Sequence, residues 1–134
     1  MAQASDHRHT VLLVDDNDDL REAFVLLAAA MNLDAVAHGN APDALRALQQ
    51  GLRPCLILLD LSMPEMDGFA FRREQLKEPE LACIPVAIVS GVGTLRESEA
   101  RSLGLTTFLR KPVDVSELRQ LFVEHCGTPP SSRP

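Results

Sequence analysis

The sequence predicts a doubly wound α/β sandwich, with five parallel strands in one sheet and five helices over its two faces. Three observations support this fold class. Short, continuous apolar runs, typical of strands buried on both faces, alternate with segments whose apolar residues recur at helical spacing. The connections between them are short, which favours right-handed crossovers between parallel strands. The aromatic share of 4%, without Trp or Tyr, suits helices packed on a sheet better than an aromatic-rich β-sandwich.

The chain length of 134 residues, with 46% hydrophobic residues, suffices for one compact domain and leaves no room for a second. Residues 1–9 are polar and unpatterned, and residues 128–134 include three Pro. Such segments are typical of disordered tails. We therefore expect a tail over residues 1–9, one folded domain over residues 10–126 and a Pro/Ser-rich tail over residues 127–134.

The first half of the chain is predicted to form a strand, a helix, a strand and a helix. The apolar run VLLV stops at two aspartates, as expected of a central strand with polar groups at its carboxyl end. In the next segment apolar residues recur at alternating spacings of four and three, which places them on one stripe of a helix. Asn40 suits the N-cap of the second helix, and Gly51 stands where a left-handed C-cap is favoured. We expect these elements at Val11–Val14, Asp18–Met31, Asp34–His38 and Asn40–Gly51.

The second half repeats the alternation three times. Its first helix is the least regular, because Arg72 and Arg73 stand where a buried stripe would carry leucines, so we expect that helix to be short or partly exposed. Capping-box patterns at Thr94–Glu97 and Asp114–Glu117 open the last two helices. The elements are expected at Cys55–Leu59, Phe69–Glu78, Ile84–Val89, Thr94–Leu103, Thr106–Leu109 and Asp114–Cys126.

Charge and hydropathy exclude two classes of partner. Thirteen Lys and Arg against nineteen Asp and Glu give a net charge of -6, which repels phosphate backbones and anionic lipid, so neither nucleic acid nor a membrane is expected to bind. The N-terminal residues lack the apolar segment of a signal peptide, and no apolar run approaches the roughly 20 residues of a membrane span. We therefore expect a cytoplasmic protein.

The cysteine pattern predicts neither a disulfide framework nor a zinc site. Cys55, Cys83 and Cys126 are scattered, with no CxxC pair and no Cys/His spacing. We expect Cys55 and Cys83 to be small core residues.

Polar side chains collect where the predicted strands end. The first strand stops at Asp15 and Asp16, the third at Asp60, the fourth at Ser90 and the last just before Lys111. Each of these is an ordinary loop residue when taken alone. In an open parallel sheet, however, the carboxyl ends of the strands share one edge, where ligands bind. We therefore expect three carboxylates, a hydroxyl and an amine to converge there.

This combination of charges predicts a Mg²⁺ site suited to phosphoryl transfer. Adjacent carboxylates repel one another, and without a cation one of them would take up a proton. Mg²⁺ prefers one or two carboxylates, waters and phosphate oxygens, so Asp15, Asp16, Asp60 and the backbone carbonyl of Ser62 form a suitable set. A carboxylate is also a nucleophile towards phosphorus, and Lys111 with the Ser90 hydroxyl would surround the transferred group.

Four motifs carry a resemblance to a known family. These are VLLVDDN at the first strand, LILLDLSMPEMDG at the third, VAIVSG at the fourth and TTFLRKP at the fifth. Over residues 10–126 the sequence resembles a receiver (response regulator) domain of two-component signalling, of the stand-alone, single-domain type. The resemblance implies a flavodoxin-like sheet with the strand order 2-1-3-4-5.

The resemblance also implies a role for each residue of the acidic edge. By this likeness Asp60 is the phosphoacceptor, Asp15 and Asp16 hold Mg²⁺, Ser90 is the switch hydroxyl and Lys111 binds the phosphoryl group.

Further positions match the family with some departures. Phe108 corresponds to the switch aromatic residue but lacks a phenol, so its contacts must come from packing. Pro112 corresponds to a proline whose peptide bond is commonly cis in the family. Ser62 and Val92 occupy positions that border the phosphoryl group and influence its hydrolysis.

The resemblance implies a signalling protein rather than an enzyme, with only intrinsic autophosphorylation and autodephosphorylation. A histidine kinase or a histidine phosphotransfer protein would donate the phosphoryl group from a phosphohistidine. The response would be a change in binding to an unknown protein target, through the face formed by the helix at Thr94–Leu103, the last strand and the helix at Asp114–Cys126. A monomer or a weak, phosphorylation-dependent dimer is expected.

Two alternative functions remain open from the sequence. One is a Mg²⁺-dependent phosphohydrolase with Asp60 as its nucleophile, although such enzymes usually carry an acid/base aspartate where Ser62 stands here. The other is a degenerate receiver that binds its partner regardless of phosphorylation.

Overall fold

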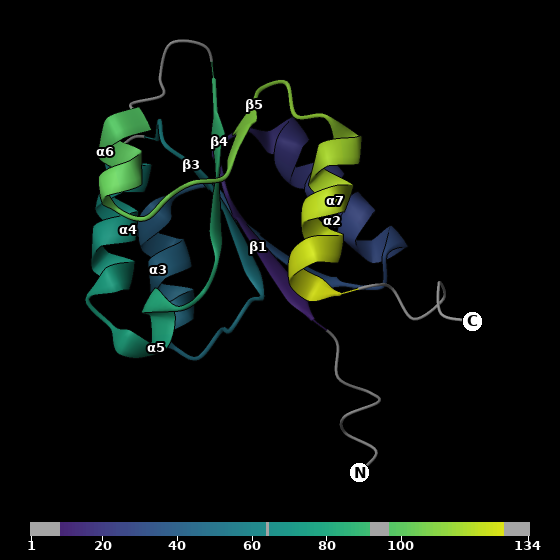
Figure 1. The fold of residues 1–134 in the computed structure, drawn as a ribbon. Coiled ribbons are helices and arrows are strands. Elements are labelled where there is room, and N and C mark those ends of the chain that lie inside the picture. The colour runs from purple at the N-terminus through teal and green to yellow at the C-terminus, as the bar shows by residue number, and fades with distance from the viewer. Residues whose placement is uncertain (1–8, 64, 92–96, 128–134) are drawn as a thin grey trace.

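The computed structural model describes residues 9–63, 65–91 and 97–127. These residues form one parallel five-stranded sheet with the strand order β2-β1-β3-β4-β5, flanked by helices on both faces (Figure 1). Helices α3, α4, α5 and α6 cover one face, and helices α2 and α7 cover the other. The predicted doubly wound fold and its strand order are therefore confirmed.

Two of the strands end on the polar residues that were expected to follow them. Strand β3 includes Asp60, which pairs with Val89 of β4, and β4 includes Ser90, which pairs with Arg110 of β5, so both residues belong to regular strand backbone. The register places Leu13 of β1 opposite Leu58 of β3, and Leu59 of β3 opposite Ile88 of β4. The strands are β1 (Thr10–Val14), β2 (Asp34–His38), β3 (Leu56–Asp60), β4 (Val86–Ser90) and β5 (Phe108–Arg110).

Four of the described helices begin at a side chain that caps their first turn. Asn17, Asn40, Asp67 and Asp114 each accept a hydrogen bond from a backbone N–H in the turn that follows. Thr94, predicted as a cap, lies outside the described residues. The described helices are α2 (Asp18–Ala30), α3 (Ala41–Gln49), α4 (Gly68–Leu76), α5 (Pro79–Ala82), α6 (Glu97–Ser102) and α7 (Val115–Cys126), one more than predicted because α5 is a separate short helix.

The sheet separates two apolar cores. Alternate strand residues point to opposite faces, so Leu12 and Val14 pack towards α3 and α4, whereas Val11 and Leu13 pack towards α2 and α7. On the second face the rings of Phe24 and Phe122 meet edge to face at 5.5 Å. Strands buried on both sides explain the continuous apolar runs of the sequence.

Helix α4 is short and partly exposed, but one of its two arginines is buried. The guanidinium of Arg72 has partners inside the protein: Nε donates to the Leu103 carbonyl at 3.0 Å and Nη1 donates to Oε1 of Gln75 at 2.9 Å. Gln75, also buried, donates in turn to the carbonyls of Leu81 and Ile84. This network ties α4 to the ends of α5 and α6, whereas the neighbouring Arg73 is exposed and pairs with Glu99.

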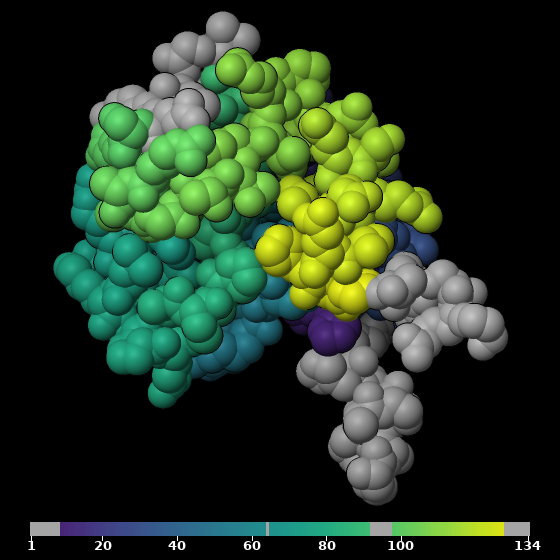
Figure 2. Space-filling model, in the orientation of Figure 1, coloured from purple at the N-terminus to yellow at the C-terminus, as the bar shows by residue number. Residues whose placement is uncertain are grey.

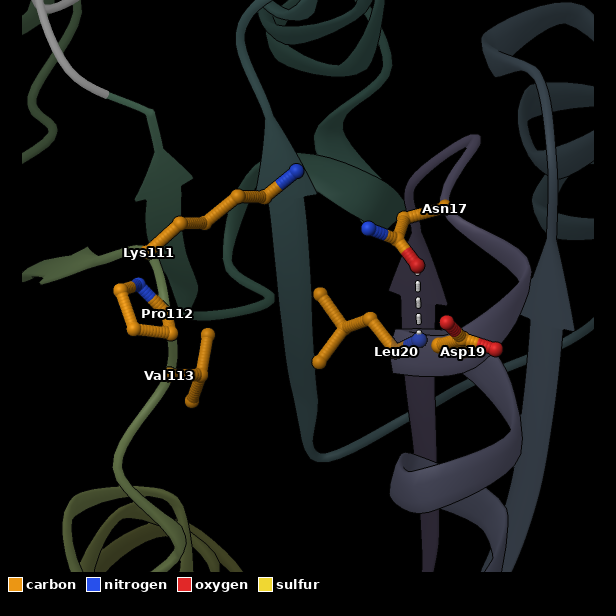
Figure 3. Close-up of a pocket in the computed structure, with 6 residues that line it drawn as sticks. All are labelled: Asn17, Asp19, Leu20, Lys111, Pro112 and Val113. Carbon is orange, nitrogen blue, oxygen red and sulfur yellow. Dashed lines mark hydrogen bonds between the residues drawn. The ribbon is translucent and has the colours of Figure 1, made fainter.

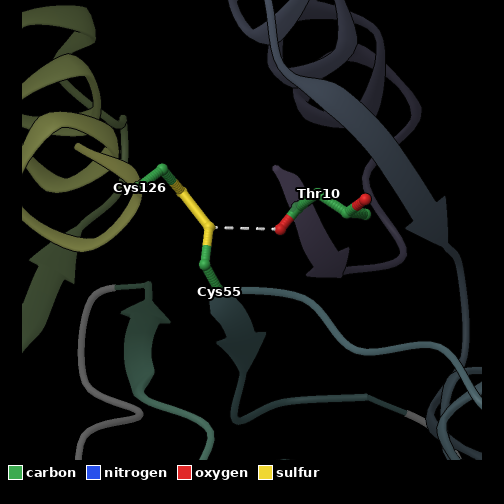
Figure 4. The surroundings of a disulfide bond; sticks show 3 residues. All are labelled: Thr10, Cys55 and Cys126. Atoms are coloured by element: carbon green, nitrogen blue, oxygen red, sulfur yellow. Dashed lines mark hydrogen bonds between the residues drawn. A yellow bond between two sulfur atoms is a disulfide. The ribbon is translucent and has the colours of Figure 1, made fainter. Parts of the chain in front are cut away.

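The cysteines correct one expectation. Cys55, just before β3, and Cys126, at the end of α7, form a disulfide bond (Figure 4). Their separation of 71 residues follows no local spacing rule, and only the packing of α7 against the sheet brings them together. Cys83, expected in the core, is exposed.

Two features of the surface complete the description. The segment from α6 through β5 to α7 forms a continuous surface across the near side of the molecule (Figure 2). Among the described residues, no helix has the length and apolar character needed to cross a membrane.

Candidate functional site

The polar residues predicted at the strand ends meet at the carboxyl edge of the sheet. Asp15 follows β1, Asp60 ends β3, and Lys111 follows β5. Carboxylate oxygens of Asp15, Asp16 and Asp60 all lie within 4.8 Å of one another, with Asp15 and Asp60 buried and Asp16 exposed. The structure therefore brings together the carboxylates that the sequence singled out.

Asp15 is held in place from several directions. Its Oδ1 accepts the backbone N–H of Asn17 at 2.9 Å, and its carbonyl accepts Nη1 of Arg21 at 2.8 Å. Its Oδ2 is buried and accepts no hydrogen bond of good geometry among the described residues, although Nζ of Lys111 lies 2.9 Å away. A buried carboxylate oxygen with spare capacity is a suitable ligand for a cation.

Asp60 sits in an environment that opposes its ionisation. Burial contributes most to raising the pKa of Asp60, and the charges of Asp15 and Asp16 raise it further. The backbone N–H of Ser62, which donates to Oδ1 at 3.1 Å, and the Lys111 cation act in the opposite direction. A second cation beside Asp60 would therefore favour its charged, nucleophilic form.

Lys111 provides the one cation that directly contacts both buried carboxylates among the described residues. Nζ lies 2.9 Å from Oδ2 of Asp15 and 3.6 Å from Oδ2 of Asp60. Burial lowers the pKa of Lys111, but the hydrogen bond and the charge of Asp15 outweigh it, and the net pKa is raised. The amine therefore stays protonated at neutral pH.

The donor set fits Mg²⁺. It offers carboxylate oxygens from three residues, and the buried Oδ2 of Asp15 is not saturated with hydrogen bonds. Asp15, Asp16 and Asp60 could hold such an ion. The Ser62 carbonyl remains a predicted ligand, on an exposed residue that directly follows the sheet edge.

The two predicted switch residues lie on neighbouring strands beside this cluster. Ser90 is buried at the end of β4, and its carbonyl accepts the backbone N–H of Lys111 at 2.8 Å. Phe108 opens β5, opposite Ile88, and packs against the core under α6. The guanidinium carbon of Arg101 on α6 lies 5.8 Å from the centre of the Phe108 ring, a contact that no motif indicated. Val92 lies outside the described residues.

Gly68 is a site residue that the sequence reasoning missed. A Cβ atom at this position would lie 2.6 Å from the carbonyl oxygen of Asp60 and 2.9 Å from Cα of Leu61. Only glycine therefore allows the first turn of α4 to approach the backbone of the phosphoacceptor candidate so closely. The motif LILLDLSMPEMDG contains this glycine, but a glycine after Pro and Asp is also common in ordinary loops, so the sequence alone does not single it out.

A depression opens beside the cluster, between the start of α2 and the connection from β5 to α7 (Figure 3). Lys111 and Asn17 approach it from opposite sides, and Leu20 forms part of its apolar wall. The Lys111–Pro112 peptide bond in this connection is cis, as the family resemblance implied.

Comparison with known proteins agrees with this geometry. Residues 11–123 match the family described as the response regulator receiver domain. A protein-glutamate methylesterase/protein-glutamine glutaminase 2 of Cereibacter sphaeroides is 34% identical over 115 residues, which cover 83% of this chain and 31% of the relative. The response regulator Rre1 of Synechocystis is 31% identical over 116 residues, covering 84% of this chain and 49% of that protein. The chain thus spans about a third to a half of the length of these relatives.

Solved structures give the same result. A response regulator receiver protein from Pseudomonas putida superposes with a TM-score of 0.79 at 33% identity, covering 88% of this chain and 98% of that one. The chemotaxis protein CheY4 of Vibrio cholerae shares the fold, with a TM-score of 0.79 at 23% identity over 89% of this chain and 99% of its own.

Proposed function

Because this chain belongs to the response regulator receiver domain family, we propose that it accepts a phosphoryl group on Asp60, with Mg²⁺, and thereby switches its binding to another protein. The observation that carries the proposal is the contact of the buried Asp60 with Lys111 inside a cluster of three carboxylates. The donor would be a phosphohistidine on a histidine kinase or a phosphotransfer protein.

The reaction needs an ionised Asp60 and a means of neutralising the incoming group. An oxygen of Asp60 forms the bond to phosphorus while the P–N bond of the donor imidazole breaks, and the imidazole nitrogen keeps the electron pair. The Ser62 N–H holds Oδ1, which leaves Oδ2, on the side of Lys111, as the oxygen that attacks. Mg²⁺, when bound, would neutralise the carboxylates and the phosphoryl oxygens together.

The response would start at Lys111 and Ser90. Phosphorylation adds about 1.5 to 2 negative charges at pH 7. Those oxygens would compete with Asp15 for the Lys111 amine and attract the Ser90 hydroxyl from the adjacent strand. Phe108 would then turn into the vacated space, and its contact with Arg101 would change with it. The altered surface would lie on α6, β5 and α7, where a target protein or a second copy of the domain would bind.

The test is incubation of the full chain with a small acyl phosphate and Mg²⁺. We expect an acid-stable, base-labile gain of one phosphoryl group at Asp60, lost in Asp60→Asn and abolished by a chelator. Asp43→Asn is the matched control, because Asp43 is an exposed carboxylate on α3. An unmodified wild-type protein, or equal modification of Asp60→Asn, would contradict the proposal.

The phosphohydrolase alternative gains no support from the site. The residue two positions after Asp60 contributes its backbone N–H to the carboxylate, and a serine there supplies no acid/base group. We further propose that the protein acts in the cytoplasm.

A further inference from the structure

The disulfide bond connects the C-terminal end of helix α7 to the sheet, and the segment before its N-terminal end carries Lys111, which contacts the acidic cluster. Helix α7 begins four residues after Lys111, which contacts Asp15 and Asp60, and it ends at Cys126. Cys126 is bonded to Cys55 (Figure 4). Cys55 directly precedes β3, and the other end of β3 carries Asp60. Both ends of α7 are therefore connected to the sheet that holds the phosphoacceptor candidate.

The fold is compatible with the dithiol form as well as with the disulfide. Without the S–S bond, α7 would still be held by the buried side chains of Leu118, Leu121 and Phe122, whose ring meets Phe24. The sulfur of Cys55 lies 3.3 Å from the carbonyl oxygen of Thr10 (Figure 4). A disulfide sulfur has no proton, so this contact becomes an S–H···O hydrogen bond in the dithiol form alone. The reduced Cys55 thus already has an acceptor.

The two cysteines differ in exposure. Cys126 is buried, at 6% exposure, whereas Cys55 is only partly buried. The more exposed residue favours attack by an external thiolate on Cys55, which would make the Cys126 sulfur the leaving group.

We propose that Cys55 and Cys126 form a reversible exchange site for a low-molecular-weight thiol and its disulfide, and that their oxidation state regulates the movement of α7. In the oxidised form, the last turn of the helix is fixed and only its first turns can respond at Lys111. In the reduced form, the whole helix can shift as a unit. The part of this inference that concerns signalling rests on the proposed phosphorylation of Asp60; the exchange chemistry does not.

The exchange is balanced as two thiolate attacks. The first thiolate bonds to the Cys55 sulfur, the S–S bond breaks, and its electron pair goes to Cys126 as a thiolate. A second thiolate attacks the small thiol's sulfur in the mixed disulfide, the bond to Cys55 breaks, and its electron pair goes to Cys55 as a thiolate. The two small thiols leave as one disulfide, and solvent protonates both cysteines. One protein disulfide and two small thiols become two protein thiols and one small disulfide, and the reverse steps reoxidise the protein.

The test equilibrates the folded full chain in buffers of reduced and oxidised glutathione, followed by alkylation and mass analysis. We expect three alkylated cysteines under reducing conditions and one, Cys83, under oxidising conditions. Cys83→Ser is the matched control and should lose one alkylated site in both buffers, whereas Cys126→Ser should form no internal disulfide. Two results would contradict the proposed exchange site. One is a Cys55–Cys126 disulfide that excess thiol does not reduce in the folded protein, and the other is a pair of thiols that form no disulfide in the oxidising buffer.

A second measurement tests the regulation. Hydrogen exchange at the C-terminal turn of α7 should be several-fold faster in the reduced protein, and Cys126→Ser should match the reduced wild type under oxidising conditions. The change in exchange upon treatment with acyl phosphate should extend along all of α7 only in the reduced form. Equal exchange in both redox states would overturn the regulatory part. If the protein gains no phosphoryl group in either redox state, the proposed function is wrong. The experiment in glutathione buffers would still show whether Cys55 and Cys126 form a reversible disulfide.

Discussion

Replacing Gly68 with alanine tests whether the close approach of α4 positions Asp60. The added Cβ would lie 2.6 Å from the Asp60 carbonyl oxygen, whereas close C···O contacts begin at about 3.3 Å, so something must move by about 0.7 Å. Two of the three nearest atoms, Asp60 O and Cα of Leu61, belong to the backbone and cannot turn away, whereas the third is a methyl carbon of the Leu61 side chain at 2.9 Å. The strain therefore falls on the end of β3 or on the first turn of the helix.

Two opposing free-energy contributions decide the outcome. Alanine favours a helix over glycine by about 1 kcal/mol, while an added methyl group in a packed position costs about 1–3 kcal/mol. Because the first helical position gains least from propensity and the contact is with backbone, we expect Gly68→Ala to lower the free energy of unfolding by about 1–2 kcal/mol. The melting temperature should fall by roughly 4–10 °C.

The displacement should also slow the chemistry. A shift of this size moves the Asp60 carboxylate relative to Lys111 and the other carboxylates, so we expect the proposed phosphorylation from acyl phosphate to be about tenfold slower. Chemical denaturation gives the stability, and the time course of mass gain gives the rate. Gly91→Ala is the control for stability, because a Cβ there meets nothing within 4 Å. A Gly68→Ala protein as stable and as fast as the wild type would refute the steric argument.

Three further variants test other parts of the structure. The raised pKa of Asp60 means that the folded state binds this proton more tightly than the unfolded chain, so stability is lost as pH rises above the unfolded value of about 3.9. Asp60→Asn should therefore melt at a higher temperature than the metal-free wild type at pH 7, and this difference in melting temperature should decrease towards pH 4. A difference that stays constant with pH in scanning calorimetry would contradict this reasoning. Gln75→Leu leaves Arg72 and two carbonyls without their partner and should cost about 2–4 kcal/mol by urea denaturation, whereas the exposed Arg73→Gln should cost less than about 1 kcal/mol. In the oxidised protein, Cys126→Ser removes a bond that spans 71 residues and should cost about 4 kcal/mol, a difference that should vanish when both proteins are reduced.

The meeting of the polar residues at one edge of the sheet was predictable because it depends on backbone direction. In a parallel sheet all carboxyl ends share one edge, so the order of apolar run and polar residue was enough to bring Asp15, Asp60 and Lys111 together. The strand order is also confirmed, but it was an implication of the family resemblance. The continuous apolar runs indicated only which strands have both faces covered.

Other features depend on distances in space that periodicity does not encode. Arg72 breaks the apolar stripe of α4, and nothing in its own segment indicates that the Leu103 carbonyl lies within reach. Cys55 and Cys126 carry no spacing signal, because the contact arises only when α7 packs beside the start of β3. The space around Gly68 is limited because the start of α4 and the end of β3 approach within van der Waals distance. A glycine in the sequence is equally consistent with a turn, so the sequence does not predict this close approach.

Lys111 links the charge balance of the site to the position of α7. Its amine lies closer to Asp15 than to Asp60, so in the metal-free protein Asp15 is the stronger partner. A phosphoryl group on Asp60 would compete with Asp15 for this amine, and a cation that neutralised Asp15 would shift the competition towards the phosphoryl group. We therefore infer that metal binding favours the movement of Lys111 upon phosphorylation. Asp114, three residues further along, caps the first turn of α7, so the displacement would pass directly to that helix.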